Sequence, residues 1–121
     1  MPRKKQPWFR FYTEAVGDPK LRRLPPAQRW LWVAVLAAAR QSPVPGVLML
    51  SERCPLTVAD LADYASMRVK DVEAGMAAMD ELGLTEFDSA LNGWFVVRWS
   101  DRQYSSDDVT ERTRRHRLGT T

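Results

Sequence analysis

Residues 30–39 form the longest uninterrupted apolar run of this 121-residue chain, and they lie inside a segment with helical spacing. Leu31 and Val35 share one face of a helix over residues 26–41, while Trp30 makes a different face apolar as well. A helix that is apolar on every side is buried, so we predict that this segment is the central helix of one small domain. The run covers only about half the thickness of a bilayer, which excludes a transmembrane helix.

Two shorter helices, separated by a tight turn, are predicted further along the chain. Thr57 and Asp60 fit a capping box in which Asp replaces the usual Glu, at the start of a helix over residues 58–65. Ser66 can cap the next helix, whose apolar residues recur at 3.6-residue spacing. Gly83 follows this helix, and glycine commonly ends helices in the left-handed conformation.

Three apolar segments are predicted to be short strands: residues 47–50, 84–87 and 94–99. The pair Asn92-Gly93, between the last two, is a strong hairpin signal. Two short helices joined by a tight turn cross steeply, and they need a third helix and a small hairpin to bury their apolar stripes. We therefore predict an α+β fold, mainly α with a small β-hairpin, in the winged helix-turn-helix arrangement.

Charge is distributed unevenly along the chain, although the formal net charge is only +3. Residues 1–23 carry seven Lys or Arg against two Asp or Glu, residues 24–97 carry five against nine, and residues 98–121 carry six against four. Basic ends therefore flank an acidic middle. This pattern favours contact with a polyanion through the two ends, and the alternative is solubility charge on frayed termini.

The domain organisation follows this division. We predict that residues 1–24 are a basic and aromatic arm packed on the domain, that residues 25–104 are the winged helix-turn-helix domain, and that residues 105–121 are an Arg-rich polar tail. The tail can be helical or can lead to a further C-terminal region. Within the arm, the aromatic segment 8–12 is predicted to be a strand or an extended segment, and residues 19–24 a helical turn.

Candidate DNA contacts lie in the second motif helix, in the hairpin and at the two ends. Arg68 and Lys70 belong to the first helical turn, where the positive end of the helix dipole favours phosphate. Acidic residues follow along the same helix, so either only its first turn enters a groove or the helix is a protein interface. Asn92 either contacts phosphate or the minor groove, or serves only the turn. The remaining candidates are the basic residues of the two ends: Arg3, Lys4, Lys5, Arg112, Arg114, Arg115 and Arg117.

Catalytic motifs are not found in the sequence. Cys54 and His116 are the only residues of their kinds, so neither a Cys cluster nor a His-based metal or catalytic site can form within one chain. No Gly-rich phosphate loop is present. We therefore expect a non-enzyme without cofactor or metal, in which Cys54 is a small apolar filler. The basic N-terminus has no apolar segment behind it, so we expect no signal peptide and a cytoplasmic, nucleoid-associated location.

Aromatic residues are predicted to serve two purposes. Trp8 and Phe9 lie beside basic residues, an arrangement that can stack single-stranded bases. The remaining tryptophans are predicted to be core residues: Trp30, Trp32, Trp94 and Trp99.

A family resemblance rests on several segments. They are the aromatic segment 8–12, Asp18-Pro19-Lys20-Leu21, Trp30-Leu31-Trp32, the motif-helix residues 57–62 and 69–84, and the closing run 99–117. These segments resemble the N-terminal domains of phage replisome organisers, which are similar to the DnaD-type winged helices of replication initiation. The resemblance covers nearly the whole chain. It implies binding of origin DNA and recruitment of other replication proteins, such as the replicative helicase or its loader.

We therefore expect a protein that binds double-stranded DNA in phage or bacterial replication initiation. Two alternatives use the same fold. A transcriptional repressor would need a stable dimer and a palindromic operator. A protein–protein oligomerisation module would use the acidic middle and the apolar edges near Trp8 or Trp94.

Overall fold

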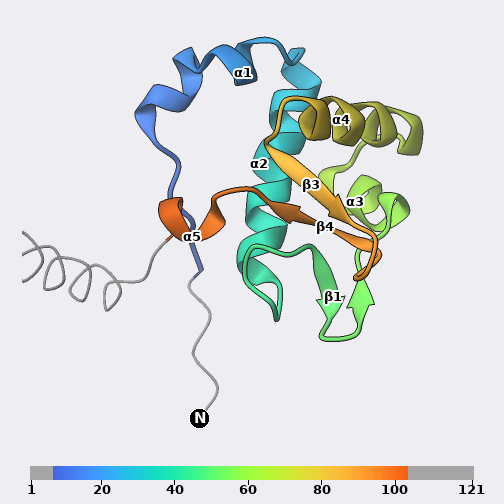
Figure 1. Ribbon diagram of the computed structural model, residues 1–121. Coiled ribbons are helices and arrows are strands. Elements are labelled where there is room, and N and C mark those ends of the chain that lie inside the picture. Colours follow the sequence, from blue (N-terminus) through green and yellow to red (C-terminus); the bar gives the residue numbers. More distant parts are fainter. Residues whose placement is uncertain (1–6, 104–121) are drawn as a thin grey trace, which may run out of the picture.

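The computed structural model describes residues 7–103, and helix α2 (Pro26–Gln41) lies at the centre of this part (Figure 1). Its bounds are those predicted from the apolar run. Pro26 occupies the first turn, where backbone N–H groups have no helical partner. Leu31 and Val35 are fully buried, and each such side chain stabilises the fold by about 1.5–3 kcal/mol.

The four tryptophans predicted to be core residues differ in burial. Trp32 and Trp99 are buried, and Trp94 is half-buried. The prediction is wrong for Trp30, which is 55% exposed. Its indole N–H donates to the carbonyl oxygen of Ala65 (3.0 Å), so the ring lies along the surface with its polar edge satisfied.

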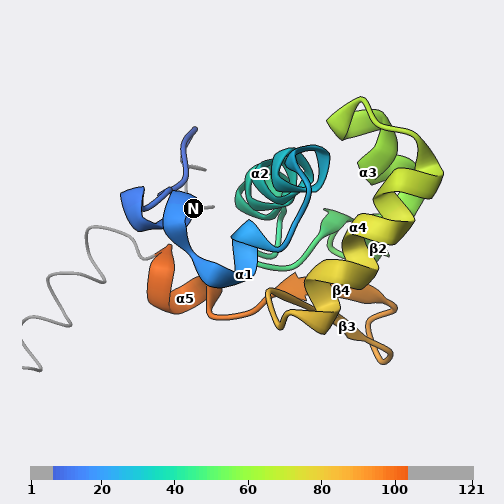
Figure 2. The same cartoon turned by 90° about the horizontal axis from the view of Figure 1, so that it is seen from above.

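Helices α3 (Val58–Ala65) and α4 (Val69–Glu81) pack on α2 and on each other (Figure 2). They bury most of the stripes that the 3.6-residue spacing predicts, including Val72, Met76 and Met79 of α4. The prediction is wrong for Val69, the first residue of the α4 stripe, which is exposed. The three helices thus share one core.

The ends of these helices confirm two of the predicted caps and contradict one. Thr57 Oγ1 accepts from the Asp60 N–H (3.1 Å) and Asp60 Oδ2 accepts from the Thr57 N–H (2.9 Å), which is the predicted capping box. The Thr57 N–H and, to a lesser extent, the Thr57 hydroxyl both donate to Asp60 Oδ2, and these two bonds lower the pKa of Asp60. Gly83 has the expected left-handed backbone (φ 75°). Ser66 does not cap α4, because it ends α3 in a left-handed conformation (φ 56°) and Arg68 occupies the N-cap of α4.

Strands β3 (Thr85–Asp88) and β4 (Gly93–Val96) pair antiparallel around a loop of residues 89–92. The predicted hairpin is therefore confirmed, and its loop is shorter than the predicted 88–93, because Asp88 and Gly93 belong to the paired strands. Helices and small antiparallel sheets together confirm the α+β class.

Residues 46–48 extend this hairpin on the free edge of β4. The Leu48 N–H donates to Trp94 O (2.8 Å), and the Val96 N–H donates to Gly46 O (2.7 Å). An isolated bridge joins the residues between them. The resulting order in space is residues 46–48, β4 and β3, so the segment that follows α2 pairs with the last strand of the chain.

A second hairpin lies between α2 and α3. It consists of β1 (Met49–Ser51) and β2 (Cys54–Pro55). The predicted strand 47–50 is therefore divided between the two sheets, and β2 was not predicted. Cys54 is exposed, so the prediction that it fills a core gap is wrong.

The predicted strand over residues 94–99 ends at Val96 and is followed by the short helix α5 (Trp99–Arg102). Arg98 has a left-handed backbone (φ 62°), which breaks the strand direction and turns Trp99 into the core. Gly46 (φ 87°) lies directly against this ring: an added Cβ would be 2.7 Å from Trp99 Cγ.

The N-terminal arm runs along one side of the domain. Of the two predictions for its aromatic segment 8–12, a strand or an extended segment, the structure shows an extended segment that forms no strand. The arm then continues into η1 (Thr13–Gly17), a turn of 3-10 helix. Helix α1 (Pro19–Arg22) is the predicted turn. Asp18 Oδ1 caps it by accepting from the N–H groups of Lys20 (2.8 Å) and Leu21 (3.3 Å).

Gly46→Ala tests the contact between Gly46 and Trp99. A Cβ at this positive φ is strained and also enters the indole ring, so we expect a loss of about 2–4 kcal/mol in the free energy of unfolding. Gly17→Ala is the matched control, because nothing lies within 4 Å of its added Cβ, and it should change stability by less than about 0.5 kcal/mol. Urea unfolding measures both, and equal stability of the two variants would contradict the packing described here.

Candidate functional site

The first turn of α4 presents the two cations predicted from the sequence. The Arg68 and Lys70 side chains are both exposed. Arg68 Nε lies 3.2 Å from Asp71 Oδ2, so a neighbouring carboxylate already partly neutralises this guanidinium. The α4 N-cap makes no side-chain hydrogen bond, which leaves N–H groups of the first turn without that partner. An anion at the first turn of α4 would therefore interact favourably with the backbone dipoles of that turn and with the Lys70 ammonium.

Asn92 closes the β3–β4 loop. Its left-handed backbone (φ 57°) is a conformation that Asn adopts more readily than most residues, and its side chain is exposed. Asp88 Oδ1 accepts from the N–H groups of Ala90 (2.9 Å) and Leu91 (3.4 Å) at the other end of the loop. Turn geometry alone thus accounts for the presence of Asn92.

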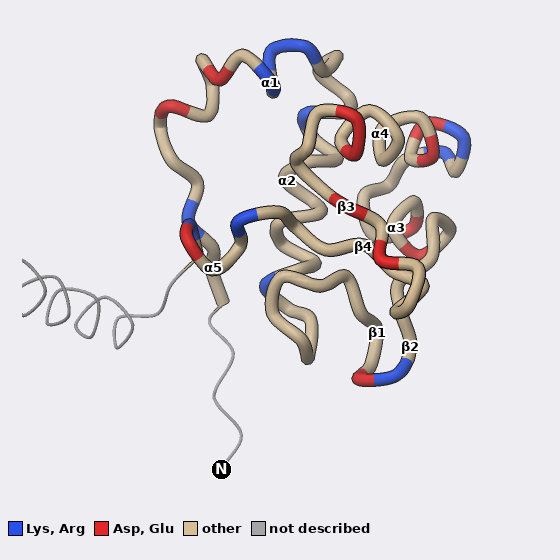
Figure 3. Tube along the Cα trace, in the orientation of Figure 1, with Lys and Arg blue, Asp and Glu red and all other residues tan. Residues whose placement is uncertain are grey.

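The surface around these candidates is acidic. Residues 57–96 carry eight Asp or Glu, and Arg68 and Lys70 are their only cations. Figure 3 shows that the Asp and Glu positions are spread over α3, α4 and the β3–β4 hairpin. Asp80 has a structural task, since Trp94 Nε1 donates to its Oδ2 (3.2 Å). We call this surface the acidic face: Asp60, Asp63, Asp71, Glu73, Asp80, Glu81, Glu86 and Asp88.

The two ends of the described chain are joined by a buried side chain. The Arg10 N–H donates to Gln103 Oε1 (2.7 Å), and Gln103 Nε2 donates to Arg10 O (2.7 Å). Tyr12 Oη donates to Arg102 O (2.9 Å), and Arg102 Nη1 lies 3.3 Å from Glu14 Oε1. We call this set the terminal clasp. It holds the segment from Arg10 to Glu14 against Arg102 and Gln103, the last described residues.

Arg40 supports the clasp from α2. Its guanidinium lies over the Trp99 ring (5.1 Å to the centroid), and its Nη2 is 3.4 Å from Gln103 O. Burial lowers the pKa of Arg40, and the neighbouring Arg10 charge lowers it further. Its Nε is buried without a hydrogen-bond partner in the described part of the chain.

The sequence candidates thus fall into separate groups. Arg68, Lys70 and Asn92 lie on the side of the domain that carries α3, the start of α4 and the hairpin loop. The clasp lies on the opposite side in both views (Figures 1 and 2). The other candidates lie outside the described residues: Arg3, Lys4, Lys5, Arg112, Arg114, Arg115 and Arg117.

Sequence reasoning missed the clasp. Gln103 and Arg10 are 93 positions apart, and a single Gln in a polar segment carries no local pattern. The available signal was indirect, because the aromatic arm needs a partner surface to cover its rings.

Two other kinds of feature, a metal site and a membrane-spanning helix, were sought in residues 7–103. This part of the chain contains no group of three or more His, Cys, Asp or Glu placed to hold a metal ion. No helix in the same range is long and apolar enough to cross a membrane. Comparisons with protein-family models, with curated proteins and with solved structures find no match.

Gln103→Ala tests the clasp. Loss of both hydrogen bonds should speed amide hydrogen exchange at Arg10 by roughly tenfold or more, because a typical hydrogen bond contributes about 1 kcal/mol. Ser100→Ala, an exposed change in the adjoining helix α5, should leave that amide protected. Hydrogen exchange at Arg10 that is equal in both variants would show that the arm is held by other contacts.

Proposed function

We propose that this chain is a winged helix-turn-helix protein that binds double-stranded DNA. The element order from α2 to β4 supports the fold, as does the packing of α3 and α4 on each other and on α2. The sheet order of residues 46–48, β4 and β3 supports it further, because the first strand-like segment pairs with the last strand beside the helix pair. Such a domain can place a helix in the major groove and a hairpin loop alongside it.

The observation that carries the proposal is the terminal clasp. The chain ends hold the densest positive charge in the sequence, with three cations in residues 1–6 and four arginines between positions 112 and 117. The Arg10–Gln103 hydrogen bonds bring the attachment points of both segments together. We propose that these two basic segments, attached close together, act as one electrostatic footprint for the phosphate backbone.

The first turn of α4 is the second proposed contact. Arg68 and Lys70 precede the carboxylates of that helix, so a duplex can approach the helix start without lying along its acidic length.

We further propose a role in phage or bacterial replication initiation, because segments of the sequence resemble the N-terminal domains of phage replisome organisers. In that role it would bind origin DNA and recruit a replicative helicase or its loader, without catalysis or cofactor, in the cytoplasm at the nucleoid. A transcriptional repressor on the same fold remains the alternative, and a preference for one palindromic site over repeated sites would favour it.

A protein-interaction module is the second candidate function, and the acidic face favours it. Eight carboxylates against two cations repel phosphate along most of α4 and the hairpin. Exposed Tyr64 and Val69 add apolar surface at the turn between α3 and α4. This combination suits a basic protein partner better than it suits DNA.

Loss of the basic ends tests the proposed footprint. Deleting residues 111–121, or changing Arg3, Lys4 and Lys5 to Ala, should weaken binding to every duplex about equally. Each lost phosphate contact should make the log–log salt slope shallower by about 0.9. Fluorescence anisotropy with a preferred and a scrambled duplex at two salt concentrations measures this. Arg53→Ala, an exposed cation between β1 and β2, is the control. An affinity for duplex DNA that does not change with salt concentration would contradict the proposal.

Changing Arg68 and Lys70 to Ala tests the helix contact. Both side chains are exposed, so the fold should survive, and specificity at one base position should relax by about 1–3 kcal/mol if either residue reads a base. Competition between single-base variants of the preferred duplex measures this, with Arg53→Ala again as the control. Unaltered DNA binding by the double variant would instead assign α4 to a protein interface.

A further inference from the structure

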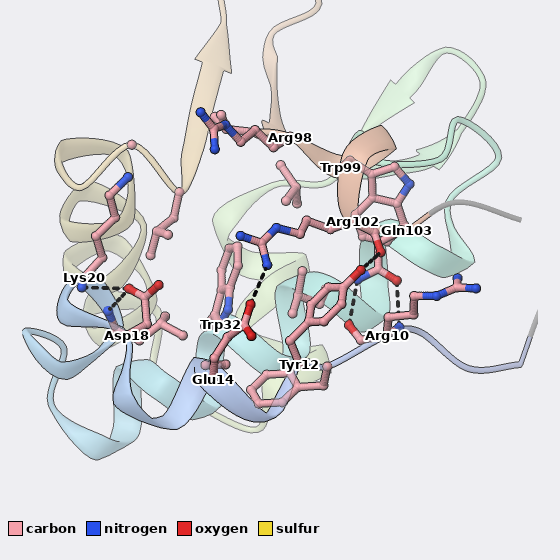
Figure 4. A pocket seen from close by; sticks show the side chains of 18 of the residues that line it. Arg10, Tyr12, Glu14, Asp18, Lys20, Trp32, Arg98, Trp99, Arg102 and Gln103 are labelled. Atoms are coloured by element: carbon pink, nitrogen blue, oxygen red, sulfur yellow. Dashed lines mark hydrogen bonds and ion pairs between the residues drawn. The ribbon is translucent and has the colours of Figure 1, made fainter. Parts of the chain in front are cut away.

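A cavity of about 640 Å³ lies between the N-terminal arm and the body of the domain (Figure 4). Its size falls in the range of small-molecule sites. The arm from Arg10 to Leu21 forms one side, and α2, the end of β4 and α5 form the other. It lies next to the terminal clasp and away from α4's first turn, so the proposed DNA contacts do not account for it.

The floor of this cavity is apolar. Trp32 and Leu36 of α2 line it together with Leu84 and Val96, and three of these four side chains belong to the buried core. A flat or flexible apolar group resting here would be removed from water against these side chains.

The rim carries positive charge in excess. Glu14 pairs with Arg102, and Asp18 Oδ1 is occupied by the N–H groups of α1. Lys20 and Arg98 also line the cavity and extend to the same rim (Figure 4). Within residues 7–103, neither of these two side chains has an ion pair or hydrogen bond to another residue.

One wall of the cavity can move at little cost. The segment η1 (Thr13–Gly17) buries no residue fully, and its contribution to the core is the partly buried Ala15, so its displacement breaks little core packing and the exposed Glu14–Arg102 ion pair. A ligand can therefore enter from the arm side while α2 and β4 stay fixed.

We propose that this cavity binds a small amphiphilic anion, with its apolar body on Trp32 and Leu36 and its phosphate or carboxylate between Lys20 and Arg98. The apolar floor supplies affinity, and the two cations fix the orientation of the anionic group. The proposal is independent of DNA binding.

Anilinonaphthalene sulfonate is the probe, used with the full chain. We expect one binding site per chain, with its fluorescence enhanced, and weaker binding of the neutral analogue N-phenylnaphthylamine. Phenyl phosphate and phenylacetate should compete, inorganic phosphate should not, and the stronger of the two competitors identifies the anionic group.

Three variants locate the site. Lys20→Met with Arg98→Asn should weaken probe binding roughly tenfold, the loss expected when a charge-assisted hydrogen bond is removed, and Asn retains the left-handed backbone. Val97→Trp should block the cavity while keeping both cations. Arg22→Met with Arg23→Met is the matched control, because these exposed cations of the same helical turn do not line the cavity.

Two results would overturn the proposal. One is an equal loss of affinity in the control pair, which would mean that the probe responds only to net charge. The other is unchanged binding in both the Lys20/Arg98 pair and the Val97→Trp variant. Thermal unfolding checks that the Val97→Trp variant is folded. If it is not, the binding measured for the variant with Lys20→Met and Arg98→Asn decides the outcome.

Discussion

The burial of α2 is the constraint on which the rest of the structure depends. Its apolar side chains cover so much of its circumference that α3, α4 and β4 all pack against it. A chain this short can build only one such core. Every other element is therefore arranged by which face of α2 it covers, and the arm closes the face that these elements leave.

Local signals in the sequence predicted most of the helices, but they did not predict the contacts between residues that are far apart in the chain. The Thr57–Asp60 box and Gly83 act within one helical turn, so their types and spacing are sufficient evidence. The pairing of residues 46–48 with β4 and the left-handed backbone of Arg98 depend on the packing of Trp99. Propensity carries no information on such packing.

The candidate site was predictable in the same uneven way. Arg68 and Lys70 could be assigned to a helix start, because the apolar stripe of α4 defines where that helix begins. Their surroundings could be assigned only in part, since the acidic residues of the hairpin join those of α3 and α4 through the fold. The result is a domain with charge of opposite sign on two sides. Such a molecule orients itself in the field of a polyanion before any contact forms.

The clasp also has a mechanical consequence. The Arg10–Gln103 pair connects the two ends of the folded domain directly, so tension applied between the terminal segments is borne first by these two hydrogen bonds. The helical core lies outside that line of force. A load transmitted through partners held at both termini would therefore open the arm while α2, α3 and α4 remain folded.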